Sequence, residues 1–220
     1  MWFFQILYKE FLSLRPVIWL ALLAFTIAIL GLQGNRVVMS YIGKIGPAYP
    51  FLSSNFMNAY FVVAYFLAVI VGIWQTQSEF FRGTWLFLLH RPRGLTELVV
   101  AKAFSGTLIS LTVCAIPAIL YGMSVSIPGV LPGPFQWSYT GQFWRLWLFI
   151  PILQLGAYTT GLRHGRWYVS RLCPFLAAVL MTALTFLLAI HWLLLIVLLG
   201  FVLVLQVIEL RQEVSQRDFS

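Results

Sequence analysis

The strongest constraint on this chain is a series of six long apolar runs that contain almost no charge. Helices of roughly 17 to 25 apolar residues can cross the hydrocarbon core of a bilayer. Only 9% of the 220 residues are charged, against about 25% in an ordinary soluble domain. We therefore predict an all-α integral membrane protein with six transmembrane helices in a domain at 16–208. The predicted spans are about 16–32, 56–74, 98–121, 143–162, 173–189 and 192–208.

The residues on either side of this domain are predicted to lie at the membrane surface or in water. Residues 1–15 are interpreted as an N-terminal interfacial amphipathic helix, and residues 209–220 as a polar cytoplasmic tail. A helix of the first kind lies in the membrane surface with its apolar face buried. The apolar face is predicted to hold Phe3, Leu7, Phe11 and Leu14.

The distribution of Lys and Arg predicts the orientation of the chain in the membrane. With the N-terminus inside, ten of the fourteen basic residues lie in inner segments and two lie in outer segments. Cytoplasmic loops carry such an excess of basic residues. We therefore predict a multi-pass protein of the cell inner (plasma) membrane with both termini in the cytoplasm. The pattern assigns no role to the long outer loops at 33–55 and 122–142.

The net charge of +8 favours a lipid partner over a nucleic acid. The basic residues are spread between apolar spans, as expected for loops that face anionic lipid. A nucleic-acid surface would show a basic stripe interleaved with exposed aromatic residues, and the sequence has none. We predict contact with membrane lipid and no nucleic-acid binding.

The residue types of an enzyme site or a metal site do not occur in a recognisable spacing. The motifs of zinc proteases, serine hydrolases and phosphate-binding loops are all missing from the sequence. The two cysteines, Cys114 and Cys173, lie in or beside apolar runs and are interpreted as small buried hydrophobic residues. We predict no catalytic residue, no metal ligand and no cofactor in this chain. The predicted spans also offer no acidic ligand for a coupling ion.

Two basic residues fall inside predicted spans. Lys102 lies about six residues into the third span, and Arg145 lies close to the start of the fourth. Long basic side chains near the end of a span can extend to the interface. Both are therefore interpreted as candidate interfacial anchors.

The segment between the second and third spans is predicted to form a short amphipathic helix at the membrane surface. Glu79 and Arg82 are three residues apart and face the same way on a helix. Pro92 disfavours helical geometry at the preceding residue and ends the helix. The apolar stripe of this helix would comprise Phe81, Trp85, Leu88 and Leu89.

This segment resembles the region between the second and third spans of ABC-2 type transporter permeases. The resemblance rests on Glu79, Gly83-Thr84, Leu88-Leu89, Arg91-Pro92 and Lys102. In that family the region is a cytoplasmic coupling helix that contacts an ATPase subunit. The residues implied to contact such a partner here are Glu79, Arg82, Gly83, Thr84, Trp85, Leu88, Leu89, Arg91 and Pro92.

The resemblance implies a permease subunit of an ATP-binding-cassette exporter. Its partners would be an ATPase subunit and a second permease subunit, in a homodimer or heterodimer. ATP and Mg²⁺ would bind in the ATPase subunit, because this chain has no Walker motif. Many family members carry short outer helices between the fifth and sixth spans, but Ile190 and His191 leave no room for them here.

Three other interpretations remain open from the sequence. The segment at 78–95 could be a surface helix that only seals the bundle. The protein could be a non-transporting membrane scaffold or assembly factor that binds a different partner through the same helix. A haem-exporter-like permease has a similar length and number of spans, without a specific motif in its favour.

Overall fold

A computed structural model describes residues 2–41, 51, 54–81, 95–127, 135–163, 171–188 and 191–215, and every regular element in these ranges is helical. The all-α class is therefore confirmed, with no strand in this part of the chain. The helices are α1 (Trp2–Tyr41), α2 (Ser54–Phe81), α4 (Leu95–Val125), the 3-10 helix η2 (Trp137–Thr140), α5 (Gly141–Trp147), α6 (Ile150–Leu162), α7 (Cys173–Leu188) and α8 (Trp192–Ser215).

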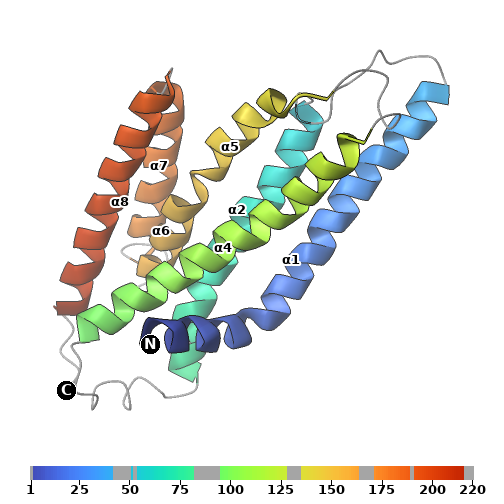
Figure 1. The fold of residues 1–220 in the computed structure, drawn as a ribbon. Helices are drawn as coiled ribbons and strands as arrows, with labels where there is room; N and C mark the ends of the chain where they lie inside the picture. Colours follow the sequence, from blue (N-terminus) through green and yellow to red (C-terminus); the bar gives the residue numbers. More distant parts are fainter. Residues whose placement is uncertain are drawn as a thin grey trace.

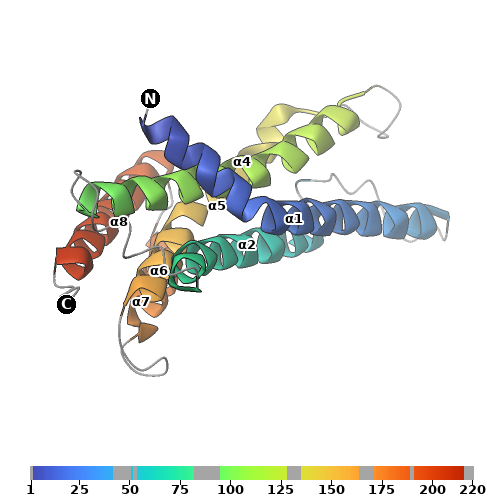
Figure 2. The same cartoon turned by 90° about the horizontal axis from the view of Figure 1, so that it is seen from below.

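The short helix α6 lies at the centre of the bundle. All of its residues are buried, and it packs against α2, α4, α7 and α8 (Figures 1 and 2). Small residues let these helices approach closely, as they do in other membrane bundles. A Cβ atom at Gly72 would clash with the backbone of α6, one at Gly156 with Ala178, and one at Gly161 with Thr76.

Within the described ranges, four helices are long and apolar enough to cross a membrane. They are Phe3–Leu30, Phe56–Glu79, Thr96–Val125 and Trp192–Val214, and α7 contributes the shorter apolar stretch Cys173–Thr185. The predicted count of six spans is not confirmed. The predicted span at 143–162 is divided between α5 and α6, with Leu148 and Phe149 between them.

Pro151 explains why α5 and α6 do not form one straight helix. A continuous helix would need the backbone nitrogen of residue 151 to donate to the carbonyl of Trp147, and proline has no hydrogen there. Near the start of α6 the missing donor costs nothing, because the first turn of a helix has no internal acceptors. α6 has only 13 residues. Because other helices enclose it, no part of its backbone faces lipid.

The N-terminal segment is continuous with the first span. α1 extends from Trp2 to Tyr41, so the helix does not end near Pro16, and part of the predicted outer loop at 33–55 is helical. The first turns lie across the direction of the rest of α1 (Figures 1 and 2). We attribute this bend to Pro16, since a proline inside a helix removes one backbone bond and kinks it.

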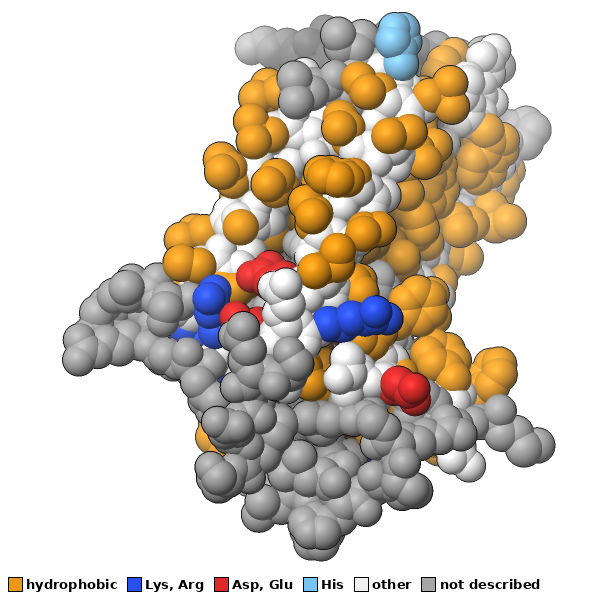
Figure 3. Space-filling model, turned by 90° about the vertical axis from the view of Figure 1, so that its left-hand side faces the viewer, with side chains coloured by type: hydrophobic (Ala, Val, Ile, Leu, Met, Phe, Trp, Pro, Cys, Tyr) orange, Lys and Arg blue, Asp and Glu red, His pale blue; other side chains and the backbone are white. Residues whose placement is uncertain are grey.

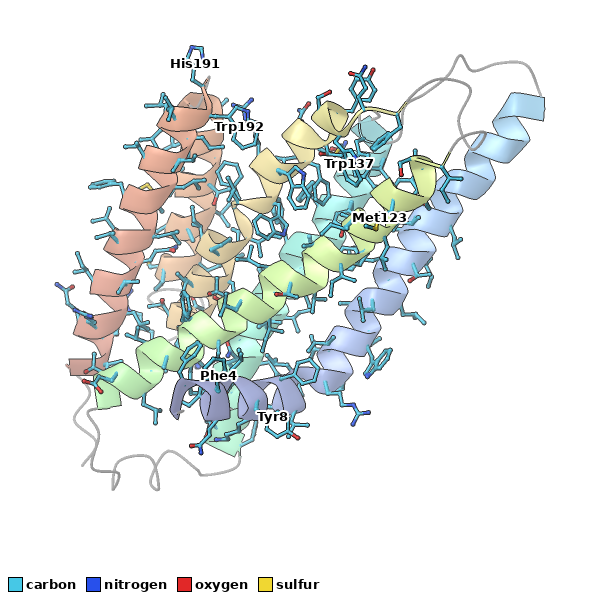
Figure 4. All side chains as sticks on the ribbon, in the orientation of Figure 1. Phe4, Tyr8, Met123, Trp137, His191 and Trp192 are labelled. Carbon is cyan, nitrogen blue, oxygen red and sulfur yellow. The ribbon has the colours of Figure 1, made fainter. Side chains whose placement is uncertain are left out.

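The outer surface is that of a membrane protein. Leu193, Val197 and Phe201 on α8 are more than half exposed, and Figure 3 shows a broad apolar face with charged side chains gathered toward one end. Exposed aromatic residues lie at both ends of the bundle (Figure 4). Phe4 and Tyr8 lie at one end and Trp192 at the other, which is the placement of aromatic belts at two membrane interfaces.

Many of the largest buried side chains form an aromatic cluster near the start of α2. Phe25 stacks on Tyr60 with ring centroids 4.6 Å apart, and Tyr60 contacts Phe143 at 5.1 Å. The Tyr60 hydroxyl donates to the carbonyl of Cys114. We call the whole set the aromatic cluster: Phe25, Phe51, Phe56, Tyr60, Phe61, Tyr121 and Phe143.

Candidate functional site

The segment predicted to contact an ATPase begins at the end of α2, and the structure describes only its first residues. Glu79 lies in the last turn of α2. The other predicted contact residues lie outside the described ranges: Arg82, Gly83, Thr84, Trp85, Leu88, Leu89, Arg91 and Pro92. The coupling helix therefore stays a prediction, and the described residues nearest to it are the end of α2 and the start of α4.

Glu79 belongs to a set of polar residues that joins four helices. Lys102 Nζ lies 2.7 Å from Glu79 Oε1 and 3.2 Å from Glu10 Oε1. Lys9 Nζ lies 3.1 Å from the same oxygen of Glu79. We call this set the charged cluster: Lys9 and Glu10 from α1, Gln75 and Glu79 from α2, Lys102 from α4 and Gln154 from α6.

Three charged residues of the cluster are almost fully buried. Glu10 is 2% exposed, Glu79 is 5% exposed and Lys102 is 4% exposed, whereas the Lys9 side chain is 56% exposed. Removing an ion from water costs several kcal/mol, and only well-placed partners offset that cost. The ammonium of Lys102 contacts one carboxylate from α1 and one from α2, so its burial is accompanied by direct pairing.

Glutamine side chains extend the charged cluster into the bundle. Gln75 Nε2 donates to Glu10 Oε2 at 2.9 Å and to the Lys102 carbonyl at 3.0 Å. Gln154 Nε2 donates to Gln75 Oε1 at 3.0 Å, and the Thr107 hydroxyl donates to Gln154 Oε1 at 2.6 Å. Each of these buried amides is thereby hydrogen-bonded through both its nitrogen and its oxygen, which avoids the cost of orphaned polar atoms.

Helical spacing and one glycine account for this local arrangement. Gln75 and Glu79 are four residues apart on α2 and lie on the same face. Gly106 on α4 leaves room for the Gln75 amide, since a Cβ atom there would clash with Gln75 Oε1. A larger residue at this position would displace the amide that contacts both Glu10 and Lys102.

The arrangement connects helices and carries no recognisable reactive group. Two carboxylates face two ammonium groups, so the four charged residues balance. The described part of the chain has no group of three or more His, Cys, Asp or Glu side chains that could hold a metal ion. What the cluster can do is fix α1, α2, α4 and α6 to one another at a single point.

The structure differs from two expectations about these residues. Lys102 was expected to reach the interface, but its ammonium is sealed between Glu10 and Glu79 inside the bundle. The physical reason is that two acidic partners are supplied by helices distant in sequence. The N-terminal part of α1 also buries a different face from the predicted one, which included Phe11. Ile6, Glu10 and Leu14 are buried, whereas Phe11 is exposed.

Glu10, Gln75 and Gln154 were missed as site residues. One signal was available for Glu10, which follows Ile6 and precedes Leu14 at intervals of four and so shares their helical face. An acidic residue on an otherwise apolar stripe indicates a buried partner. Gln75 and Gln154 carry no comparable local signal.

Arg145, the second candidate anchor, lies far from the charged cluster. It is partly exposed in α5, and its guanidinium carbon lies 5.6 Å from the centroid of the Trp192 ring. This distance is typical of a cation–π contact. Arg145 therefore lies beside one of the exposed aromatic residues at the end of the bundle opposite Phe4 and Tyr8.

Comparisons with protein-family models, with curated proteins and with solved structures find no match for this chain.

Proposed function

We propose that this chain is the transmembrane subunit of an ATP-binding-cassette exporter, driven by a separate ATPase subunit that docks on residues 79–92. The chain has no Walker motif, so the energy for transport would come from the partner. ATP and Mg²⁺ would bind in that partner. A second permease subunit would complete the transport unit in the membrane.

The observation that carries the proposal is the ion pair that joins the start of the docking segment to the helix that follows it. Glu79 lies at the end of α2, where the segment begins, and Lys102 lies in α4, shortly after the segment. Their charged atoms are 2.7 Å apart and buried. A displacement of the segment by a docked ATPase would therefore move α2 and α4 together.

The same cluster would pass that movement to α1 and α6. Glu10 of α1 contacts Lys102, and Gln154 of α6 contacts Gln75. α6 is the buried centre of the bundle, so a shift at the docking segment would reach every helix that packs on it. Ion pairs and hydrogen bonds hold these helices at fixed distances, which suits this task.

Co-purification from the native membrane in mild detergent tests the proposal. The informative substitutions are Trp85→Ala and Leu88→Ala, which fall in the segment and avoid the charged cluster. Glu79→Ala is a poor choice, because it removes a buried partner of Lys102 and could act through misfolding. Arg15→Gln, an exposed residue on α1, is the control.

We expect an ATPase subunit to accompany the wild type and Arg15→Gln, and to be lost or uncoupled in the two segment variants. After separation from any bound partner, the four permease chains should elute from size-exclusion chromatography at the same volume. If no nucleotide-hydrolysing subunit accompanies the wild type under any condition, the transporter proposal fails. A stable partner without ATPase activity would then favour a membrane scaffold or assembly factor.

A further inference from the structure

A pocket separate from the charged cluster lies where α1, α4 and α8 meet. Its volume is about 570 Å³, which is within the range of sites for small organic groups. Residues from three helices line it: Phe3, Glu97, Val100, Ala101, Phe104 and Arg211. Phe3 comes from the first turns of α1, Glu97 from the first turn of α4 and Arg211 from the last turns of α8.

The pocket has one apolar side and one charged side. The ring centroids of Phe3 and Phe104 lie 5.9 Å apart, and Val100 continues the apolar side along α4. Glu97 and Arg211 carry opposite charges and both are exposed. Within the described residues, neither has an ion-pair partner within 4.0 Å, although they line the same space.

The position of the pocket matches the boundary between lipid tails and headgroups. Charged side chains gather toward one end of the α8 face, next to a broad apolar surface (Figure 3). The exposed rings of Phe4 and Tyr8 lie at this same end of the bundle (Figure 4). Exposed aromatic rings and basic side chains are enriched where a membrane span meets the headgroups.

We propose that this pocket binds the headgroup of phosphatidylethanolamine. Arg211 would hold the phosphate through charge-assisted hydrogen bonds, and Glu97 would accept hydrogen bonds from the primary ammonium. The side of the pocket formed by Phe3, Val100 and Phe104 would contact the glycerol and the first part of the acyl chains. This inference does not depend on the proposed transport function.

The charge pattern favours this lipid over other common phospholipids. A ligand that satisfies both side chains must carry an anionic and a cationic group in the same headgroup. The trimethylammonium group of phosphatidylcholine has the charge but no hydrogen to donate to Glu97. Phosphatidylglycerol lacks the cation, so nothing in its headgroup would offset the repulsion between its phosphate and the Glu97 carboxylate.

Lipid retention by the full-length protein tests the proposal. The purified chain is reconstituted with equal amounts of dioleoyl phosphatidylethanolamine, phosphatidylcholine and phosphatidylglycerol, and the lipids retained after extraction are quantified by native mass spectrometry. We expect phosphatidylethanolamine to be retained about five- to tenfold over phosphatidylcholine, the contribution of one partly exposed charged hydrogen bond. Phosphatidylglycerol should be retained least.

Two substitutions separate the roles of the charged residues. Glu97→Gln should bring the ratio of phosphatidylethanolamine to phosphatidylcholine to within about twofold, because only the ammonium contact is weakened. Arg211→Gln should lower the retention of both lipids, because both share the phosphate. Glu213→Gln and Arg15→Gln are matched controls: Glu213 pairs with Arg163 at 3.1 Å, and Arg15 lies on α1 outside the pocket.

The controls should retain lipids as the wild type does, and all variants should show the wild-type melting temperature, since the substituted side chains are wholly or partly exposed. Preferential retention of phosphatidylglycerol by the wild type would overturn the proposal and indicate an anionic-lipid site at Arg211. An unchanged lipid ratio in Glu97→Gln would also overturn it, as would retention in the same proportions as the added lipids.

Discussion

The two buried clusters lie toward opposite ends of α2 and stabilise the bundle by different means. The aromatic cluster holds Tyr60 near the start of α2, and the charged cluster holds Glu79 near its end, roughly 28 Å away along the helix. The first cluster excludes water through the area of its rings. The second depends on a small number of atoms placed at hydrogen-bonding distance.

This difference decides what each cluster tolerates. Ring packing is spread over many weak contacts, so one altered side chain removes a fraction of the total. In the charged cluster a single buried ammonium group, that of Lys102, contacts both buried carboxylates. Losing that group leaves uncompensated charge in a low-dielectric interior. We therefore expect substitutions that preserve shape to be mild in the aromatic cluster and severe in the charged cluster.

Lys102→Met should have the largest effect, because it keeps most of the side-chain volume and removes the charge. Glu10 and Glu79 would lose the buried cation that lies between them. Breaking a buried pair in this way costs about 3–5 kcal/mol of unfolding free energy. Titration of the purified protein with SDS in mixed micelles, followed by circular dichroism, measures the loss.

A compensated variant provides the control for this prediction. Combining Lys102→Met with Glu10→Gln and Glu79→Gln removes the carboxylates as well as the ammonium group, and should restore most of the lost stability. Apolar or neutral replacement of a whole buried ion pair is often close to neutral. If Lys102→Met alone were as stable as the wild type, the charged cluster would not be held by this ammonium group.

Phe143→Leu tests the aromatic cluster with a substitution of similar size. Phe143 is fully buried, and its ring centroid lies 5.1 Å from the ring centroids of both Tyr60 and Phe61. We expect a loss of about 1–2 kcal/mol, because the apolar volume is mostly kept while ring–ring contacts disappear. The same SDS titration measures it. A loss larger than that of Lys102→Met would reverse the comparison between the clusters.

Tyr60→Phe should have a smaller effect. The substitution keeps the ring among its aromatic neighbours and removes only the hydroxyl that donates to the Cys114 carbonyl. A buried hydrogen bond of this kind contributes about 1 kcal/mol. Thermal unfolding in detergent should show a small decrease in melting temperature. A loss comparable to that of Lys102→Met would mean that the aromatic cluster also depends on a single polar contact.

The sequence predicted the membrane class and most helix positions, because hydropathy depends only on the residues within a short window of the chain. The prediction for 173–189 agrees closely with α7 (Cys173–Leu188), and the prediction for 192–208 lies within α8 (Trp192–Ser215). The separation of α5 from α6 was missed. Hydropathy alone does not distinguish a helix that faces lipid from one enclosed by protein, and α6 is fully enclosed.

The charged cluster was beyond prediction for a different reason. Glu10 is 65 residues from Gln75, and Lys9 is 70 residues from Glu79. Spacing rules relate residues within one helix and say nothing about which helices meet. Lys102 stood out as a charge in an apolar run, but its partners depend on the packing of α1 and α2 against α4. The predicted docking residues from Arg82 to Pro92 stay untested, because they lie outside the described ranges.

Lys9→Gln should have the smallest effect and separates buried from exposed pairing within one cluster. Lys9 and Lys102 approach the same oxygen of Glu79, at 3.1 and 2.7 Å, but the Lys9 side chain is 56% exposed. Water and salt already screen an exposed ammonium, so its loss should cost less than about 1 kcal/mol. The difference from the wild type should shrink further when the ionic strength is raised, whereas the effect of Lys102→Met should persist. A loss of unfolding free energy in Lys9→Gln as large as that in Lys102→Met would contradict this comparison. It would mean that the exposed pair with Glu79 stabilises the protein as much as the buried pair.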